Sequence, residues 1–348
     1  KKDAPWYYKI HSTVKYVNFD INFDELDTMP MWKKIFAYQK KQRRYKKDFT
    51  NYLMKIHPDI TVSTLRREIN FLNEIEDGSK KVGEIHFGKS HYRIFQKKFI
   101  PSFINHYITK RWRENLTKQI KKLDKFIVLT QEDKKAWGNL DNIDVIHNPL
   151  TYYPAKSSSC INKKIIAIGR YTWQKGFDLL IDAWSIVHTK HPSWELNIYG
   201  NGNRTIYQNL IEQKKLSGYI TCNLPAKNIY EEYLESSIFI LSSRYEGLPL
   251  VLAEAMSCGL PVVSFACPCG PKDIIKDRED GFLVENGNIE QLADKICYLI
   301  EHEDERISMG KKARENVKRF DKEKIMQQWI DLFNELTKEK ERAGMTNT

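Results

Sequence analysis

Short apolar runs alternate with longer helix-like segments through the second half of the chain. Each apolar run ends in polar or glycine residues, which is typical of a buried strand. The expected strands are 164–169, 194–200, 238–243, 261–265 and 281–285, and the expected helices are 177–192, 204–216 and 249–259, with further helices beginning at Ile289 and Glu303. Strands that alternate with helices predict a parallel, doubly wound α/β domain.

The first half of the chain shows the same alternation more weakly. The expected strands are 14–19, 59–63, 80–87, 125–130 and 143–148, and the expected helices are Met31–Lys55 and Phe95–Leu123. A Pro- and Ser-containing stretch without periodicity, 147–164, separates the halves and is typical of a linker. We therefore predict an α/β protein with two Rossmann-like domains, 1–155 and 160–320, facing one another across a cleft. A last helix, about 322–338, is expected to pack on a core, with the first domain as the candidate.

The stretch RYEGLPLVLAEAMSCGLPVVSF, residues 244–265, places two carboxylates in an apolar run. Glu246 and Glu254 need partners if they are buried, because an unpaired carboxylate is costly away from water. Pro249 suits the first turn of a helix that Gly259 closes. In such folds ligands bind at the carboxyl ends of the strands, and the N–H groups of Gly247 and Leu248 would favour phosphate there. The pattern predicts a ligand that carries both hydroxyls and phosphates.

The formal net charge of +11 belongs to the first half of the chain. Residues 1–150 hold 30 Lys and Arg against 18 Asp and Glu, whereas residues 151–348 hold 26 against 27. This surplus indicates an acidic partner for one domain: a membrane surface, a phosphorylated acceptor or nucleic acid. The basic segment 32–53 has an apolar stripe that is more typical of a core than of membrane insertion. Its lysines and arginines nevertheless favour an anionic membrane surface. The stripe consists of Ile35, Tyr38, Tyr45, Phe49 and Tyr52.

Cysteine usage and hydropathy bear on compartment and metal binding. The six cysteines lie mostly in apolar segments, which suggests reduced thiols in a cytoplasm. No apolar run approaches the ~18 residues of a membrane span, and the start shows no signal-peptide pattern. We expect a cytoplasmic protein that could associate peripherally with the inner membrane face. Cys267 and Cys269 form the only close cysteine pair, and no His or Cys pair supplies two further ligands, so no metal site is predicted.

Four motifs carry a family resemblance. In order along the chain, GRYTWQKGFDLLIDAW, YGNGN, SSRYEGLPLVLAEAMSCGLPVVSF and GPKDIIKDREDGFLV resemble the donor-domain motifs of the retaining GT-B glycosyltransferases of family 4. The variant CPCGPKDII is similar to the bacterial exopolysaccharide and capsule branch. The resemblance is continuous from about Lys164 to Phe320, whereas the first half matches only loosely. It implies that the domain 160–320 binds a nucleotide-sugar donor and that the domain 1–155 lies on the acceptor side.

The resemblance implies a reaction and a set of roles. A hexose or N-acetylhexosamine would move, with retained anomeric configuration and without a metal, from a nucleoside diphosphate sugar to a lipid-linked or saccharide acceptor. This donor would be UDP- or GDP-linked, and no other cofactor is implied. Glu254 would bind the ribose hydroxyls, and Glu246 a hydroxyl of the donor sugar. The remaining implied site residues are Arg170 and Lys175 for the diphosphate, His86 near the transferred sugar, Gly247, Leu248 and Pro249 at the corner that holds the sugar and distal phosphate, and Gly169, Gly200, Arg244 and Leu250 as further donor contacts.

Two departures from the family pattern stand out. Family members usually begin with a strand and a glycine-rich loop, whereas this chain opens on KKDAPWYYKIHSTVKYV, which resembles a later strand. We therefore expect a fragment or truncated chain that lacks the opening strand–helix–strand. The usual acidic position of the glycine turn is Asn201, where we expect a neutral loop contact.

Each site residue also has a plainer interpretation. Glu254 would bond nearby backbone or a lysine, and Arg170 and Lys175 would be solvated loop residues. His86 would be a satisfied core histidine, and Arg244 would simply neutralise Glu246. At the level of function, the alternatives are a non-catalytic or truncated nucleotide-sugar-binding protein, a GT-B sugar-nucleotide epimerase and a nucleic-acid-binding protein. The last is disfavoured because the basic half contains no recognisable nucleic-acid motif.

Overall fold

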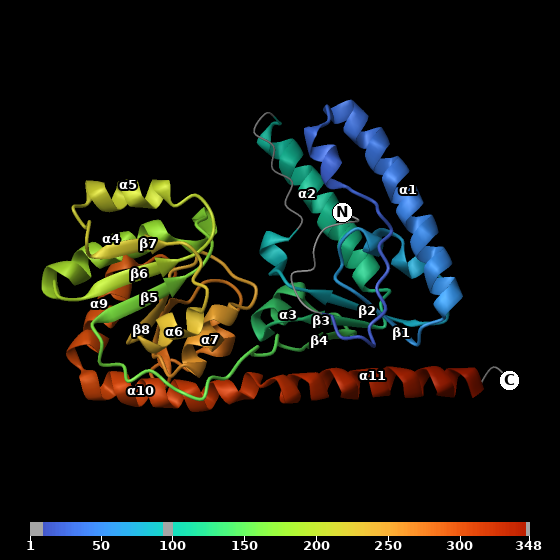
Figure 1. The fold of residues 1–348 in the computed structure, drawn as a ribbon. Coiled ribbons are helices and arrows are strands. Elements are labelled where there is room, and N and C mark those ends of the chain that lie inside the picture. Colours follow the sequence, from blue (N-terminus) through green and yellow to red (C-terminus); the bar gives the residue numbers. More distant parts are fainter. Residues whose placement is uncertain (1–9, 93–99, 346–348) are drawn as a thin grey trace. The chain divides into compact units, whose positions relative to one another are not determined.

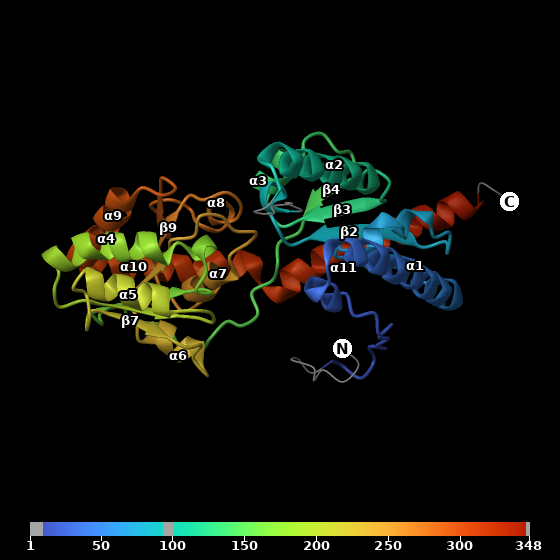
Figure 2. The same ribbon diagram turned by 90° about the horizontal axis from the view of Figure 1, so that it is seen from above.

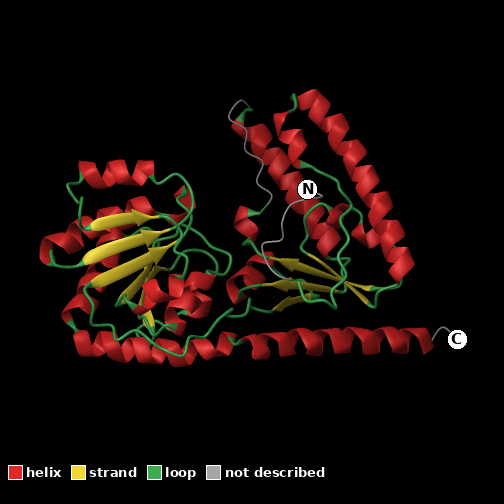
Figure 3. Cartoon of the chain, viewed as in Figure 1, coloured by secondary structure: helices red, strands yellow, loops and turns green. Residues whose placement is uncertain are grey.

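The computed structural model describes residues 10–92 and 100–345, and it contains two separate β-sheets (Figures 1 and 3). The chain divides into two compact units. One comprises Lys1–Glu84, Arg93–Phe126 and Phe333–Thr348, and the other comprises Ile85–Tyr92 and Ile127–Leu332. The predicted domains, 1–155 and 160–320, and the roles assigned to them stay predictions.

The larger sheet has six strands in the order β10-β9-β8-β5-β6-β7, and its neighbouring strands pair in parallel. The strands are β5 (Lys164–Ile168), β6 (Glu195–Tyr199), β7 (Ile220–Asn223), β8 (Ile238–Leu241), β9 (Val262–Phe265) and β10 (Gly281–Val284). The helices between and after them are α4 (Phe177–Lys190), α5 (Thr205–Gln213), α6 (Ile229–Leu234), α7 (Leu250–Ser257), α8 (Pro271–Ile274), α9 (Ile289–Glu301) and α10 (Glu303–Asn316).

Two hydrophobic cores lie on opposite faces of this sheet. Successive side chains of a strand point to opposite faces, so Ile165 joins one core and Ile166 the other. The core around Ile165 takes most of its helical residues from α4, α5 and α9, including the fully buried Trp184, and one, Met309, from α10. The core around Ile166 takes its α-helical residues from α6, α7, α8 and α10. Because both faces are covered, every residue of the central strands β8 and β9 is buried, as parallel sheets require.

The smaller sheet has four strands in the order β1-β2-β3-β4. They are β1 (Ile60–Ser63), β2 (Lys80–Ile85), β3 (Lys125–Val128) and β4 (Ile143–Val145), and the helices around them are α1 (Met31–Ile56), α2 (Ser102–Ile120) and α3 (Gln131–Trp137). β1 pairs with β2 in parallel, with Val62 opposite Val82. Figures 1 and 2 show α1 and α2 on one side of β1 and β2, with the C-terminal part of α11 (Lys322–Met345) on the other.

Ion pairs hold that part of α11 in the unit of β1 and β2. Lys340 contacts Asp59 at 3.1 Å, and Glu339 contacts Lys80 at 3.7 Å. No helix in the described part of the chain is apolar over a length sufficient to cross a membrane.

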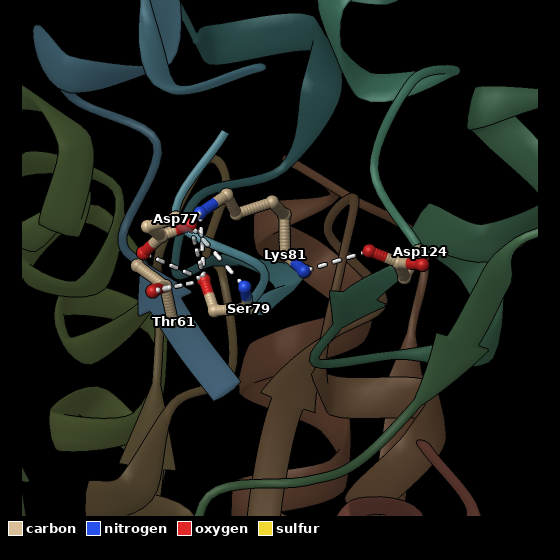
Figure 4. A network of polar contacts seen from close by, with 5 residues as sticks. All are labelled: Thr61, Asp77, Ser79, Lys81 and Asp124. Carbon is tan, nitrogen blue, oxygen red and sulfur yellow. Dashed lines mark hydrogen bonds and ion pairs between the residues drawn. The ribbon is translucent and has the colours of Figure 1, made fainter. Parts of the chain in front are cut away.

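A buried polar network fixes the start of β2 (Figure 4). Lys81 forms an ion pair with Asp77, whose side chain is fully buried. Ser79 Oγ donates to Asp77 Oδ1 over 3.0 Å and lies 2.8 Å from Thr61 Oγ1. The Lys81 N–H donates to Asp124 Oδ2 over 2.7 Å, which joins the network to the residue preceding β3. Since each charge has a partner, burial is tolerated here.

Three expectations from the sequence need correction. Residues 14–19 form no strand; Val14 and Tyr16 are exposed, and only Phe19 packs inward, against Tyr45, Phe49 and Tyr52 of α1. The predicted helix Phe95–Leu123 is Ser102–Ile120, and its first residues, 95–99, lie outside the described residues. The edge strand β7 was not predicted because it buries only two side chains, and α6 was not predicted because its six residues are too few to show a helical period.

Candidate functional site

Glu246 lies in the loop that leads from β8 into α7, and its side chain is almost fully buried. Two neighbours donate to the same oxygen: Ser243 Oγ lies 2.5 Å and Lys175 Nζ 2.7 Å from Glu246 Oε1. Within the described residues Glu246 Oε2 has no hydrogen-bond partner. The carboxylate therefore keeps one acceptor oxygen for another group, while the lysine compensates its charge.

The loop after β5 supplies Lys175 and is tied to the loop after β8. Gly176 has φ +62, and a Cβ there would lie 2.0 Å from the Ser242 carbonyl oxygen, so only glycine fits. Ser242 Oγ in turn donates to the Lys175 carbonyl over 2.9 Å. Gly169 allows a second close approach, because a Cβ there would lie 2.9 Å from Lys175 Cδ. The lysine is thus positioned from two sides.

Arg170 is exposed at the end of β5, beside the glycine turn that follows β6. A Cβ on Gly200 would lie 1.7 Å from the Gly169 carbonyl oxygen, so the two backbones touch. The Tyr171 N–H donates to the Asn201 carbonyl over 2.7 Å, a neutral loop contact. Both loops therefore place their polar groups at the carboxyl edge of the sheet, where folds of this class bind ligands.

Arg244 contacts Asp178 rather than Glu246. Its Nη1 and Nη2 donate to the Asp178 carboxylate over 2.9 and 2.6 Å, and its guanidinium lies 4.5 Å from the Trp173 ring centroid. Burial opposes ionisation of Asp178, but Arg244 outweighs it and lowers the pKa of that carboxyl. Lys175, and not Arg244, is the cation paired with Glu246. A role for Arg244 toward a donor stays a prediction.

Glu254 lies on α7 and is half-buried. Tyr233 Oη, from α6, is 3.3 Å from Glu254 Oε2 and 3.3 Å from the Val251 carbonyl. No lysine or arginine in the described part of the chain forms an ion pair with Glu254. Burial therefore raises the pKa of Glu254, although the Tyr233 hydrogen bond opposes this. A carboxylate in such a place gains from hydroxyl donors of a ligand.

The corner between Glu246 and α7 packs against the turn that carries His86. A Cβ on Gly247 would lie 2.4 Å from the His86 carbonyl oxygen. His86 itself is exposed, and the narrow gap between the two segments has no room for a water molecule. Its lining residues are Ile85, His86, Phe87, Gly88, Leu129, Thr130, Asp133 and Gly247. In the described residues the N–H groups of Gly247 and Leu248 have no acceptor, so they can receive an anion. Leu248 and Pro249 are buried, and Leu250 begins α7.

Asp133, which the sequence did not single out, holds the His86 turn in place. It is buried, and it accepts from the Lys89 N–H over 2.8 Å and from Trp137 Nε1 over 3.1 Å. Burial raises the pKa of Asp133. Ser243, Tyr233 and Asp178 were missed as well. Of these only Ser243 had a sequence signal, the polar pair that ends an apolar strand.

The cysteine pair is enclosed by protein. Cys267 and Cys269 are buried as free thiols, and burial raises the pKa of Cys269 to about 12. Within the described ranges, 10–92 and 100–345, no group of three or more His, Cys, Asp or Glu could hold a metal ion.

The arrangement combines complementary groups at one edge of the larger sheet. Glu246 and Glu254 offer acceptor oxygens, Arg170 and Lys175 offer positive charge, and the corner before α7 offers backbone donors. Such a site can bind a molecule with hydroxyls at two ends and phosphate between them.

Comparison with known proteins agrees with this chemistry. Residues 161–316 match the family described as "Glycosyl transferases group 1". The chain is 36% identical over 212 residues to an uncharacterized glycosyltransferase of Haemophilus influenzae, a match that covers 59% of this chain and 60% of that protein. It is 34% identical over 224 residues to the amylovoran biosynthesis glycosyltransferase AmsD of Erwinia amylovora, covering 61% of this chain and 62% of that protein. The matches thus span about 60% of the length of these relatives.

A solved structure extends the likeness to the fold. A mutant of TarM from S. aureus, in complex with fondaparinux, alpha-GlcNAc-glycerol and UDP, superposes with a TM-score of 0.67 at 26% identity. The match covers 82% of this chain and 58% of that one. The predicted GT-B class, with two Rossmann-like parallel sheets, is confirmed by this neighbour. Residues 161–316 therefore resemble glycosyl transferases of group 1, and the chain has the GT-B fold.

Proposed function

We propose that the protein is a retaining glycosyltransferase that transfers a hexose or N-acetylhexosamine from a nucleoside diphosphate sugar to a saccharide or lipid-linked acceptor. One observation carries this proposal: Lys175, Ser243 and Glu246 meet within hydrogen-bond distance, beside the unoccupied N–H groups of Gly247 and Leu248. The group 1 match and the UDP in the TarM complex support it. A UDP-linked donor is accordingly our first choice, ahead of GDP.

Each site residue has a role in this proposal. Glu254 accepts from the ribose hydroxyls, and the open oxygen of Glu246 accepts from a hydroxyl of the donor sugar. The corner Gly247–Pro249 holds the sugar and the distal phosphate. Tyr233 and Ser243 position the two carboxylates, while Asp133 holds the turn that brings His86 to the donor sugar.

The chemical step needs positive charge on the diphosphate side. Breaking the sugar–phosphate bond builds negative charge on the leaving diphosphate, and Arg170 and Lys175 stabilise it by charge-assisted hydrogen bonds. Such prearranged donors are worth about 3 kcal/mol each in a transition state. We propose that these two cations make the reaction metal-independent, so EDTA should leave the rate unchanged.

The acceptor and the location follow from the relatives and from charge. AmsD is named for amylovoran biosynthesis, and the TarM complex contains alpha-GlcNAc-glycerol, which together favour a saccharide acceptor in bacterial surface polysaccharide synthesis. The basic first half would hold the enzyme at the anionic cytoplasmic face of the membrane, at about 1 kcal/mol per Lys or Arg close to the surface. Liposome flotation with anionic lipid tests this association.

Calorimetric titration with UDP, GDP, ADP and their sugars, without metal, tests the donor site. We expect saturable binding of one nucleotide, weakened at least tenfold in Glu254→Ala. The matched control is Glu212→Ala, an exposed glutamate of α5, which should bind as the parent chain does. No binding of any nucleotide to the folded protein would refute the proposal.

The reaction itself is tested by incubating the chain with the bound nucleotide sugar and a panel of saccharide acceptors. NMR of the product should show the anomeric configuration of the donor. Nucleotide binding without transfer would instead favour a nucleotide-sugar-binding protein. That outcome is a real alternative because the matches span only about 60% of the relatives' length.

A further inference from the structure

A second pocket lies in the unit of α1 and β1, outside the candidate donor site. Its volume is about 290 Å3, near the lower limit of ~300 Å3 for small-molecule sites. It is formed by the segment 16–23, by Tyr45 of α1 and by the turn Arg66–Glu68 that follows β1. This turn stands at the carboxyl end of a parallel strand, the end at which α/β folds bind ligands.

Aromatic rings form the apolar part of the pocket. Phe19, Phe23 and Tyr45 line it, with Phe19 and Phe23 at 6.1 and 6.3 Å from the Tyr45 ring centroid. The tilted contact of Phe19 with Tyr45 and the edge-on contact of Phe23 with Tyr45 fix the orientation of these rings. Flat aromatic faces with fixed orientation suit the C–H faces of a sugar ring, which are apolar although its edges are polar.

Polar groups of both kinds stand beside the rings. The Arg67 guanidinium lies 4.2 Å from the Phe23 ring centroid, and in the described residues it forms no ion pair. Tyr45 Oη has no hydrogen-bond partner in the same residues. Glu68 accepts from Ser63 Oγ over 2.7 Å and from the Arg66 N–H over 3.0 Å, both through Oε1, so its Oε2 stays available. The pocket therefore offers donors and an acceptor that its own residues do not use.

The backbone holds Arg67 at this place. Gln42 Nε2, from α1, donates to the Arg67 carbonyl over 2.9 Å, so the turn is fixed to the helix that also carries Tyr45. Burial and the nearby Glu68 raise the pKa of Tyr45 to about 12, so its hydroxyl stays a donor at neutral pH. A preformed site of this kind loses little entropy when it binds a ligand.

We propose that this pocket binds one sugar unit of the acceptor, with its ring against Phe23 and Tyr45 and its hydroxyls on Arg67, Tyr45 and Glu68. A neutral sugar ring with many hydroxyls is bound by aromatic faces together with hydrogen-bond donors and acceptors, and this pocket has all three. A phosphate alone would need only the arginines, and it would be repelled by Asp20 and Glu68, which also line the pocket. The role as an acceptor subsite rests on the proposed function; the binding of a saccharide does not.

Saturation-transfer NMR on the whole chain tests the proposal, with the methyl glycosides of glucose, galactose and N-acetylglucosamine as probes. We expect saturation of at least one glycoside, reduced at least fivefold in Arg67→Ala and in Tyr45→Phe. Tyr45→Phe keeps the ring packing and removes only the hydroxyl, so it distinguishes binding from folding. Arg43→Ala is the matched control, because Arg43 is an exposed arginine of the same helix outside the pocket. Thermal unfolding of each variant verifies the fold.

The outcomes separate this proposal from that of the donor site. Glycoside binding that persists in both pocket variants, or no binding of any glycoside, would overturn it. Inorganic phosphate binding at Arg67 in place of the glycosides would also overturn it, by making the pocket an anion site. UDP titration is run on the same samples and should be unchanged by Arg67→Ala. If the parent chain bound none of UDP, GDP and ADP, the proposed function would be refuted, while the saccharide site would still be judged by its own signals.

Discussion

Lys175 Nζ lies 2.7 Å from Glu246 Oε1, although 71 residues separate them along the chain. The Lys175 side chain is 13% exposed and that of Glu246 is 7% exposed, so water screens the pair poorly. The charged form of each side chain is therefore stabilised by the other rather than by water. A bound diphosphate would compete with Glu246 for Lys175, which couples occupancy of the site to the position of the carboxylate.

Removing the cation of this pair should destabilise the fold. Lys175→Met leaves a buried carboxylate without its partner, and we expect the free energy of unfolding to fall by about 3 kcal/mol. The double variant Lys175→Met with Glu246→Gln should lose less than the sum of the two single losses, as chemical denaturation would show. Lys164→Met is the control: it removes the exposed pair with Glu235 and should cost below ~1 kcal/mol. An additive double variant would contradict the coupling.

The raised pKa of Glu254 should appear in the pH dependence of stability. Burial favours the protonated form of the Glu254 carboxyl. The stability that this protonated carboxyl contributes is therefore fully present below its ordinary pKa of 4.5, and it is lost as the pH rises through the raised pKa of the folded state. We expect Glu254→Gln to unfold at a higher temperature than the parent chain at neutral pH, with the difference vanishing in acid. Its nucleotide binding should nevertheless be weaker. A variant that is less stable at neutral pH would show that Glu254 stabilises the ligand-free fold.

Much of the larger sheet could be predicted because its pattern is local. β5, β8 and β9 are apolar runs with polar ends, and α4 and α9 bury one side of a helical repeat. β7 escaped prediction because an edge strand buries only Ile220 and Cys222. Residues 14–19 were wrongly predicted to be a strand because β-branched and aromatic residues recur there, while burial of Phe19 against α1 decided their conformation.

The candidate site was predictable in its members but not in its pairings. Glu246, Glu254, Arg170 and Lys175 stand out by type and by place after strands. Which cation meets which carboxylate depends on how two loops pack, through contacts such as Gly176 against the Ser242 carbonyl. Arg244 adjoins Glu246 in sequence, yet it pairs with Asp178, and Lys175 takes the nearer place in space.

The close approach of Gly247 to His86 gives a third prediction. A Cβ in Gly247→Ala would lie 2.4 Å from the His86 carbonyl oxygen, so the corner and the histidine turn must separate. A displacement of this order at a catalytic site can cost about 100-fold in rate. We therefore expect Gly247→Ala to lower the kcat of sugar transfer about 100-fold and to lower the free energy of unfolding only modestly. Gly218→Ala is the comparison: it has φ +88 in open space, so it should strain the backbone without affecting transfer. Equal rates in both variants would contradict the proposed place of His86.

The network at the start of β2 gives a prediction for acid stability. Burial disfavours the Asp77 carboxylate, but the hydrogen bond and charge of Lys81, with two hydrogen bonds from Ser79, outweigh it and hold the pKa of Asp77 below 3.8. The stabilisation is therefore present above pH 3.8 and is lost as the pH falls through the lower pKa of the folded state. Asp77→Asn should lower the free energy of unfolding by about 3 kcal/mol at neutral pH, with a smaller difference in strong acid.

Two further variants show whether the pair itself is responsible. Asp77→Leu with Lys81→Met replaces both charges by apolar groups, and it should be more stable than Asp77→Asn because no buried lysine is left without a partner. Asp59→Asn removes the ion pair between Asp59 and Lys340. Because the Asp59 side chain is 76% exposed, this variant should change the free energy of unfolding by less than ~1 kcal/mol. Urea denaturation at neutral and acid pH measures all three. If Asp77→Asn lost no more stability than Asp59→Asn, water would have to reach Lys81 in the folded state. Burial would then not determine how much this network contributes to the free energy of unfolding.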